Sequence, residues 1–166
     1  MSQPEPSAGT TAPADVPMPD SVAAGTLNHA ILRVARLHRM LAGQLLRRVG
    51  LHPGQELVMM QLWDRGPQRQ TDLVRMLGSD AATMTRTVRR LETAGFVRRH
   101  PSATDRRVSI IEPTAAGNAL RGEVEQVWTD LEARVAEGMT PARQAEAVEV
   151  LNRIEESLAR ATSQQT

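Results

Sequence analysis

The sequence contains no cysteine, no lysine and no tyrosine among its 166 residues. The absence of cysteine excludes disulfides, thiol redox sensing and cysteine-ligated zinc. Because lysine is absent, all 20 cationic side chains are arginines, which are permanently charged and donate hydrogen bonds as a rigid fork. Aromatic residues are also scarce: only Trp63, Phe96 and Trp128 occur. We therefore expect an aliphatic core.

The sequence lacks the signals that are typical of membrane proteins, secreted proteins, metalloproteins and nucleotide-binding enzymes. No apolar run approaches the roughly 20 residues of a membrane-spanning helix. The N-terminus has neither the basic nor the apolar region of a signal peptide. The four histidines are scattered and lack the i, i+4 spacing of a helical metal site, and no glycine-rich phosphate loop follows a predicted strand. We expect a soluble cytoplasmic protein that is not an enzyme and has no metal, cofactor or membrane partner.

The net charge of +1 conceals a segregation of charge along the chain. Residues 26–50 carry five arginines and no acid, and residues 65–107 carry ten arginines against four acids. Residues 112–156 reverse this balance, with ten acids against four arginines. The pattern predicts a polyanion-binding face in the middle of the chain and a face with another role in the C-terminal third.

Hydrophobic periodicity separates a tail from the rest of the chain. Residues 1–25 contain five prolines and almost nothing to bury, which predicts a disordered tail. From Leu27 onward apolar residues recur at helical spacing, so a first helix should run to about Gly50. The segment "HPG" should start a second helix with Pro53 in its first position, and "RGP" at residues 65–67 should end it.

Two short helices are predicted next, in "QTDLVRMLG" and "SDAATMTRTVRRLETAG". The carboxylate of Asp80 should cap the second of these helices, and Gly95 should close it. Its expected inward residues are Met84, Val88 and Leu91, which leaves a polar, basic side. Two short helices joined by a tight turn are typical of a helix-turn-helix, with a plain helical hairpin as the alternative.

The segments "FVRRH" and "RVSII", joined by "PSATDR", predict a β-hairpin directly after these helices. A hairpin in this position is a wing, and its tip would carry Arg106 and Arg107. Arginines are drawn into the electronegative minor groove of duplex DNA. Asp105 is expected to orient an adjacent arginine through an ion pair. The alternative interpretation is a solvated, charged turn.

Two long helices complete the predicted order. Thr114 should cap one helix that continues to about Val135, and Thr140 with Pro141 should start another that reaches at least Leu158. The predicted fold class is therefore mainly α with a small β-hairpin wing (α+β). It is a winged helix-turn-helix with long N- and C-terminal helices.

The run "LGSDAATMTRTVRRLETAGFVRRHPSATDRRVSIIEPTAAG" resembles the multiple-antibiotic-resistance regulator (MarR) family of bacterial winged-helix repressors. The matching features are Thr83, Thr85 and Arg86, then "RRLETAGFVRR", the "DRR" tip and a Thr-x-x-Gly helix start at residues 114–117. The resemblance covers about residues 27–160. It implies one MarR-type domain at residues 26–162, with a DNA-binding lobe at 51–113 and dimerisation helices at 26–50 and 114–162.

The family pattern also implies a homodimeric transcription regulator, most often a repressor, bound to an inverted repeat in double-stranded DNA. Ala82, Thr83 and Arg86 would face base edges, with Arg86 able to contact guanine through two hydrogen bonds. Arg107 would enter the minor groove and Arg106 would contact the backbone, next to Asp105. The remaining candidates for phosphate contacts are Gln70, Thr71, Thr85, Arg89 and Arg90.

Some positions depart from the family pattern, and the charge segregation suggests how the dimer is paired. Arg69 stands where Ser or Thr commonly caps the third helix, so that cap is not expected. Pro113 replaces a leucine and is expected to shorten the second strand of the hairpin. Interlocked terminal helices could pair basic residues of the first helix with acids of the last, namely Arg33, Arg36 or Arg47 with Glu149 or Glu155.

Many relatives release DNA when a small aromatic or lipophilic anionic effector enters a cleft beside the dimer helices. The candidate lining residues here are His29, Arg33, Arg36, Met59, Trp63 and Trp128. Alternatively, the tryptophans belong to the core and the arginines form dimer ion pairs. The alternative function is a winged-helix protein-interaction module that has lost specific DNA binding.

Overall fold

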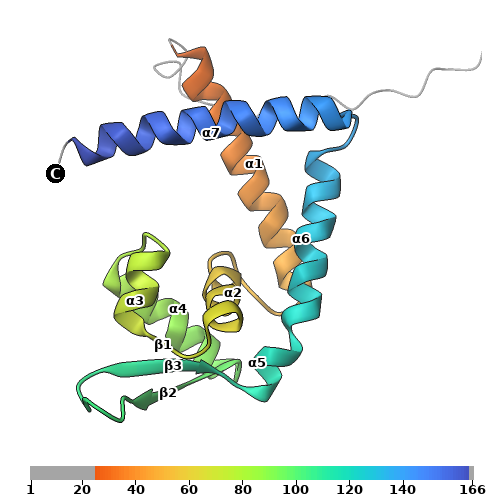
Figure 1. Cartoon of the computed structure of the whole chain (residues 1–166). Helices are drawn as coiled ribbons and strands as arrows, with labels where there is room; N and C mark the ends of the chain where they lie inside the picture. Colours follow the sequence, from red (N-terminus) through yellow and green to blue (C-terminus); the bar gives the residue numbers. More distant parts are fainter. Residues whose placement is uncertain (1–24, 165–166) are drawn as a thin grey trace, which may run out of the picture. The chain divides into compact units, whose positions relative to one another are not determined.

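The computed structural model describes residues 25–164 (Figure 1). The tail predicted for residues 1–25 lies outside this range, apart from Gly25. The elements, in chain order, are α1 (Thr26–Arg48), α2 (Gln55–Arg65), β1 (Gln68–Arg69), α3 (Gln70–Met76), α4 (Ala81–Thr93), β2 (Val97–Pro101), β3 (Ser109–Pro113), α5 (Ala115–Ala119), α6 (Arg121–Val135) and α7 (Pro141–Ser163). The predicted fold class, mainly α with a small β-hairpin, is confirmed.

The chain divides after Leu41 into two compact units. The first unit contributes most of α1, a helix that matches the predicted one in both position and length. Among its apolar residues, Leu27 and Val34 are exposed. None of the described helices combines the length and the apolar character that a crossing of the membrane requires.

The second unit is built around a small sheet and the helices packed on it. The sheet has the strand order β1-β3-β2, and both pairings are antiparallel. Its central strand, β3, places Ile111 opposite Gln68 on one side and opposite Arg99 on the other. The hairpin of β2 and β3 was predicted, whereas β1 was not, because two residues carry no alternating pattern.

The strand bounds differ from the prediction at both ends of the hairpin. Pro101 belongs to β2, and Arg107 and Val108 lie in the turn instead of in β3. The prediction that Pro113 shortens the second strand is wrong, because β3 includes Pro113 and pairs it with Val97. A proline is tolerated there because it is the last residue of the strand.

The core of the second unit is aliphatic, as predicted. It combines α2, α3, α4 and α6 with the sheet, and the three inward residues predicted for α4 are all buried. Its members with at most 2% exposure are Leu45, Leu46, Leu51, Val58, Met59, Leu62, Leu73, Met84, Val88, Leu91, Val97, Ile111, Val124 and Leu131. This burial fixes which side of α4 remains free.

The second helix begins later than predicted. Gly54 precedes it with a φ of 91°, in the left-handed region that favours glycine, so α2 starts at Gln55 and not at Pro53. The N–H of His52 donates to Oε1 of Gln55 at 2.7 Å, and the N–H of Gln55 donates to the carbonyl of His52 at 3.0 Å. The "HPG" segment is therefore a closed turn before the helix.

The long helix predicted after Thr114 is divided into α5 and α6 at Leu120. In a continuous helix the carbonyl of Gly117 would accept the N–H of Arg121. Here the indole Nε1 of Trp63 donates to that carbonyl at 3.2 Å. This contact from α2 lies at the division between α5 and α6.

The last helix starts as predicted. Thr140 caps α7 by accepting the N–H of Arg143 at 3.4 Å, and Pro141 occupies the first turn. No described residue of α7 is buried. Four of its large apolar residues are more than half exposed, namely Val148, Val150, Leu151 and Leu158.

Candidate nucleic-acid interface

The turn between α3 and α4 is tight, and its geometry follows from the sequence. Gly78 has a φ of 56°, and the N–H of Ser79 donates back to the carbonyl of Val74 at 3.0 Å. The N-cap of α3 is Arg69, whose side chain makes no capping hydrogen bond, as the sequence predicted. The two helices form a helix-turn-helix, followed directly by the β2–β3 hairpin.

Asp80 caps α4, as predicted. Its Oδ1 accepts the N–H of Thr83 at 2.7 Å. Hydrogen bonds from the side chain and the backbone of Thr83 hold the pKa of Asp80 below its ordinary value. The hydroxyl of Thr83 in turn accepts Nη2 of Arg86 at 2.9 Å. Two of the three residues predicted to face base edges are thus joined on the outer side of α4.

The outer side of α4 is basic and lacks acidic partners. All six of its predicted contact residues are exposed, namely Ala82, Thr83, Thr85, Arg86, Arg89 and Arg90. Within residues 25–164, none of its three arginines has a carboxylate oxygen within 4.0 Å. Three fixed positive charges on one exposed helical face are typical of a surface that binds a polyanion.

One flank of α4 is tied to α3 and to the hairpin by Gln70. Its Nε2 donates to Oγ1 of Thr85 at 2.9 Å, and its Oε1 accepts Nη1 of Arg99 at 3.3 Å. Nε of Arg99 also lies 3.8 Å from a carboxylate oxygen of Glu92. The sequence interpretation treated Gln70 and Thr85 as separate phosphate contacts and missed Arg99. Exposed Thr71, at the start of α3, remains a separate candidate.

We call the β2–β3 hairpin with its connecting turn, residues 97–113, the wing. At its tip Oδ1 of Asp105 accepts the N–H of Arg107 at 2.9 Å, and the carbonyl of Asp105 accepts the N–H of Val108 at 3.0 Å. Asp105 makes no ion pair with any described arginine, so the predicted ion-pair role is wrong. Aspartate often bonds to the backbone two residues onward, and this bond shapes the turn.

The side chains of Arg106 and Arg107 are exposed and have no carboxylate partner within the described residues. At the base of the wing, Glu112 accepts Nε and Nη2 of Arg98 at 3.1 and 2.9 Å. Mainly these bonds hold the pKa of Glu112 below its ordinary value. Nε2 of His100 lies 3.2 Å from the same carboxylate. The base of the wing is therefore internally paired, and its tip is not.

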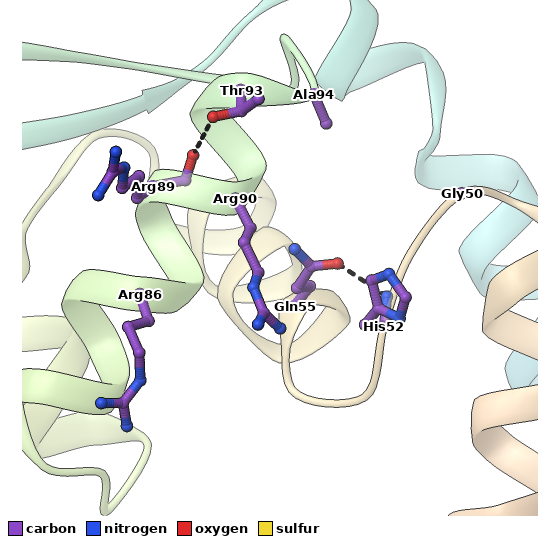
Figure 2. A pocket seen from close by; sticks show the side chains of 8 residues that line it. All are labelled: Gly50, His52, Gln55, Arg86, Arg89, Arg90, Thr93 and Ala94. Carbon is purple, nitrogen blue, oxygen red and sulfur yellow. Dashed lines mark hydrogen bonds between the residues drawn. The ribbon is translucent and has the colours of Figure 1, made fainter.

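The other flank of α4 borders a hollow of about 610 Å³, which we call the α4 groove (Figure 2). It is lined by Gly50, His52, Gln55, Arg86, Arg89, Arg90, Thr93 and Ala94. Its α4 wall contains residues that the sequence singled out. Its opposite wall, with His52 and Gln55, did not emerge from the sequence, because no local pattern places this turn beside α4.

The candidate effector residues fall into two groups. His29, Arg33 and Arg36 lie on the part of α1 that belongs to the first unit. In the second unit, Trp63 and Trp128 line one hollow of about 320 Å³. Met59 has 0% exposure and belongs to the core, so its predicted place in the lining is wrong, and Met60 lines the hollow instead. Val58 and Leu62 of the same helix are also buried, so this side of α2, with Met59, faces the core.

A helix-turn-helix between the first and second strands of a three-stranded antiparallel sheet, with a hairpin that projects as a wing, defines a winged-helix fold. Residues 51–109 match the model of the MarR family. The matched range includes α4 and the "TDRR" tip of the wing, the residues on which the predicted resemblance to this family rests.

One relative identified by sequence is the uncharacterized HTH-type transcriptional regulator YwoH of Bacillus subtilis. It is 35% identical over 85 residues, which cover 51% of this chain and 61% of that protein. The matched stretch therefore spans about three fifths of the length of this relative.

Solved structures agree with the fold. A mutant of MarR from E. coli complexed with operator DNA has a TM-score of 0.72 at 22% identity, over 80% of this chain and 96% of that one. Reduced AbfR bound to DNA has a TM-score of 0.68 at 26% identity, over 86% of this chain and 98% of that one.

Proposed function

We propose that the chain is a homodimeric, sequence-specific regulator of transcription that acts as a repressor. It binds an inverted repeat in double-stranded DNA. The observation that carries this proposal is the exposed side of α4, where Arg86, Arg89 and Arg90 have no carboxylate partner among the described residues. The unpaired tip of the wing, with Arg106 and Arg107, supports it. MarR-family proteins are transcription regulators and not enzymes.

The electrostatics of α4 favour a polyanionic partner. Arg86 is three positions from Arg89 and four from Arg90, and like charges at these spacings destabilise a helix by a few tenths of a kcal/mol. A duplex relieves this repulsion and releases counterions as its phosphates are neutralised. In this proposal Arg86, with Thr83 and Ala82, reads base edges, while Arg89, Arg90, Thr71 and the Gln70–Thr85 pair lie along phosphates.

Dimerisation through the terminal helices is the second part of the proposal. A monomer would leave the apolar residues of α7 in water, and full burial of a leucine or valine side chain is worth about 1.5–3 kcal/mol. Leu151 and Leu158 are both 59% exposed and lie two helical turns apart. A partner's helices would cover them. The pairing of Arg33, Arg36 or Arg47 with Glu149 or Glu155 remains part of this proposal.

One experiment tests dimerisation and DNA recognition together. Duplexes selected from a random pool should contain inverted repeats with half-sites about 10 bp apart, because a two-fold dimer reads the two half-sites symmetrically. Sedimentation should give a dimer for the wild type and a monomer for Leu151→Glu. A wild type that enriches no sequence and binds no duplex at low salt would instead favour a protein-interaction module.

Release by a small-molecule effector is the third part, and the hollow beside Trp63 and Trp128 supports it. The indole Nε1 of Trp128 is buried without a hydrogen-bond partner in the described residues, so it could donate a hydrogen bond to a ligand. Arg121 in the same hollow is engaged by Glu125 at 2.9 Å and by Asp64 at 3.7 Å. An aromatic ring with a hydrogen-bond acceptor therefore fits better here than a strong anion.

The intrinsic fluorescence of the chain tests this part directly, because Trp63 and Trp128 are its only tryptophans. An effector in the hollow should quench their emission and weaken operator binding over the same concentration range. Quenching without any loss of DNA affinity would separate ligand binding from regulation.

A further inference from the structure

The α4 groove lies on the flank of α4 opposite the flank that Gln70 ties to the wing. One wall is formed by α4, with Arg86 and Arg90 one helical turn apart. The other is formed by the turn before α2 and by its first residue, with His52 and Gln55 (Figure 2). All of these residues belong to the second unit. The groove therefore has a basic wall and a polar wall.

Gln55 is only 5% exposed, yet half of its amide is unused. Its Oε1 accepts the N–H of His52, which fixes the orientation of the amide. Its Nε2 donates to no residue within 25–164, and Figure 2 shows this nitrogen turned to the side of the groove on which Arg90 lies. This nitrogen is therefore an oriented donor on the wall of the groove, free to bond an acceptor oxygen of a ligand.

The arginines of the α4 wall also lack a partner of opposite charge. Arg90, like Arg86 and Arg89, has no carboxylate within 4.0 Å among the described residues, and no acidic side chain lines the groove. An oriented amide donor, an imidazole and unpaired guanidinium groups around one hollow form a site for an anion that offers several acceptor oxygens.

The position of the groove indicates which anion it takes. A helix in the major groove of DNA lies between two rows of phosphates, one on each strand. The flank of α4 with Gln70 and the wing approaches one row. The opposite flank, which is the α4 groove, must then approach the other row.

We propose that the α4 groove binds one backbone phosphate of the DNA strand opposite the strand approached by Gln70 and the wing. Arg90 supplies the positive charge, Nε2 of Gln55 donates a hydrogen bond, and the imidazole of His52 closes the site. This inference rests on the proposed function and adds His52 and Gln55 to the DNA-binding surface.

The test measures the affinity of the wild type and its variants for a selected duplex by fluorescence anisotropy. Arg90→Ala and Gln55→Glu should each weaken binding about tenfold, as expected for a lost charge-assisted hydrogen bond. Gln55→Glu keeps the acceptor for the N–H of His52 but places a carboxylate at a position that is only 5% exposed, so thermal melting of each variant is measured beside its affinity to show that it is folded. The matched control is Arg134→Ala, at an exposed position of α6.

Duplexes with one uncharged methylphosphonate linkage locate the contact. One linkage per half-site should weaken binding by the wild type and leave Arg90→Ala almost unaffected, because Arg90→Ala has already lost that contact. The same linkage should strengthen binding by Gln55→Glu, because it removes the repulsion between the new carboxylate and the phosphate. The linkage to which Arg106→Ala or Arg107→Ala is insensitive should lie on the other strand. Equal sensitivity of Arg90→Ala and wild type at every linkage would overturn the proposal.

Inorganic phosphate serves as the competing probe. If the groove takes free phosphate instead of the backbone, phosphate ions should raise the melting temperature of the wild type but not of Arg90→Ala, and no linkage should show coupling. That result would overturn the assignment to DNA. If the wild type binds no duplex at all, the proposed function fails with it. If Arg90→Ala binds like Arg134→Ala, the groove and the phosphate contact of Arg90 fail, whereas DNA binding by the rest of the surface stands.

Discussion

Nε2 of Gln70 donates to Oγ1 of Thr85 at 2.9 Å, between residues 15 positions apart in the sequence. The same Gln70 accepts a hydrogen bond from Arg99 of β2 at 3.3 Å. One side chain thus joins the first turn of α3, the exposed face of α4 and the base of the wing. Its effect on DNA binding would be to hold two separate contact surfaces in one relative orientation.

Removal of the Gln70–Thr85 hydrogen bond should reduce the affinity for DNA more than it reduces the free energy of unfolding. We expect Gln70→Ala and Thr85→Val each to weaken operator binding by about 0.5–1.5 kcal/mol, the usual worth of one hydrogen bond. The double variant should lose little more than either single one, because both break the same bond. Fully additive losses in anisotropy titrations would mean that the two residues contact DNA independently. Gln144→Ala, on α7, is the control.

The role of Asp105 can be tested by two substitutions that separate charge from turn geometry. Asp105→Asn keeps an oxygen that can accept the N–H of Arg107, so it should bind the operator as tightly as the wild type or more tightly. Asp105→Ala loses the acceptor and should bind more weakly. If both variants bind more tightly, only the negative charge of Asp105 matters. Electrophoretic mobility shift at constant salt decides between these outcomes.

The two arginines at the tip of the wing should differ in their response to DNA sequence. Arg107→Ala should reduce affinity more than Arg106→Ala, and its effect should be larger on duplexes with A·T-rich flanks, where the minor groove is narrow. Each change should lower the salt slope by up to about one unit. Titrations on A·T-rich and G·C-rich flanks measure both effects. A response of neither arginine to the flanks would leave the wing as a solvated turn.

Gly117 has a packing role that a methyl group would disturb. A Cβ built there would lie 2.0 Å from the carbonyl oxygen of Phe96, whereas one at Gly122 would meet nothing within 4 Å. Gly117→Ala should therefore lower the free energy of unfolding by about 1–3 kcal/mol. Gly122→Ala should raise it by about 0.5–1 kcal/mol, through helix propensity alone. Urea denaturation of both variants measures this difference.

Glu56 should make stability depend on pH. Burial raises the pKa of Glu56 above its ordinary value, although hydrogen bonds from backbone N–H groups of Glu56 and Gly54 offset part of this effect. The folded state therefore holds this proton more tightly than the unfolded state, and the cost of ionisation appears as pH rises through the folded pKa. The stability of Glu56→Gln relative to the wild type should increase from about pH 4 upward and then level off.

Denaturation curves between pH 4 and 8 measure this difference, with Glu132→Gln, at an exposed position of α6, as the control. A difference that does not vary with pH would show that the carboxyl of Glu56 titrates alike in the folded and unfolded chains.

Local rules were enough to predict much of this fold. Asp80, Thr114 and Thr140 were predicted as caps because a capping residue acts on N–H groups only two or three positions away. The buried residues of α4 followed from helical periodicity. Where a glycine changed the local geometry, as Gly54 does before α2, the predicted start of the helix was wrong.

Other features depend on contacts between distant segments, which a single sequence does not reveal. The division of the helix at Leu120 lies beside a contact from Trp63, which is 54 positions before Gly117 in the sequence. In the candidate site, the residues of α4 and the tip of the wing were predicted. Arg99, His52 and Gln55 were not, because tertiary packing alone brings them beside α4.

Thr114 also determines how freely the wing can vary. Its Oγ1 donates to the carbonyl of Gly95 at 2.6 Å, and its N–H donates to the carbonyl of Phe96 at 3.0 Å. These bonds close the chain at the two ends of the hairpin, so everything between them forms a loop with fixed endpoints. The entropy of closing a loop grows slowly with its length. We therefore expect the wing to tolerate a longer or shorter tip between Gly95 and Thr114 while α4 and α5 keep their positions.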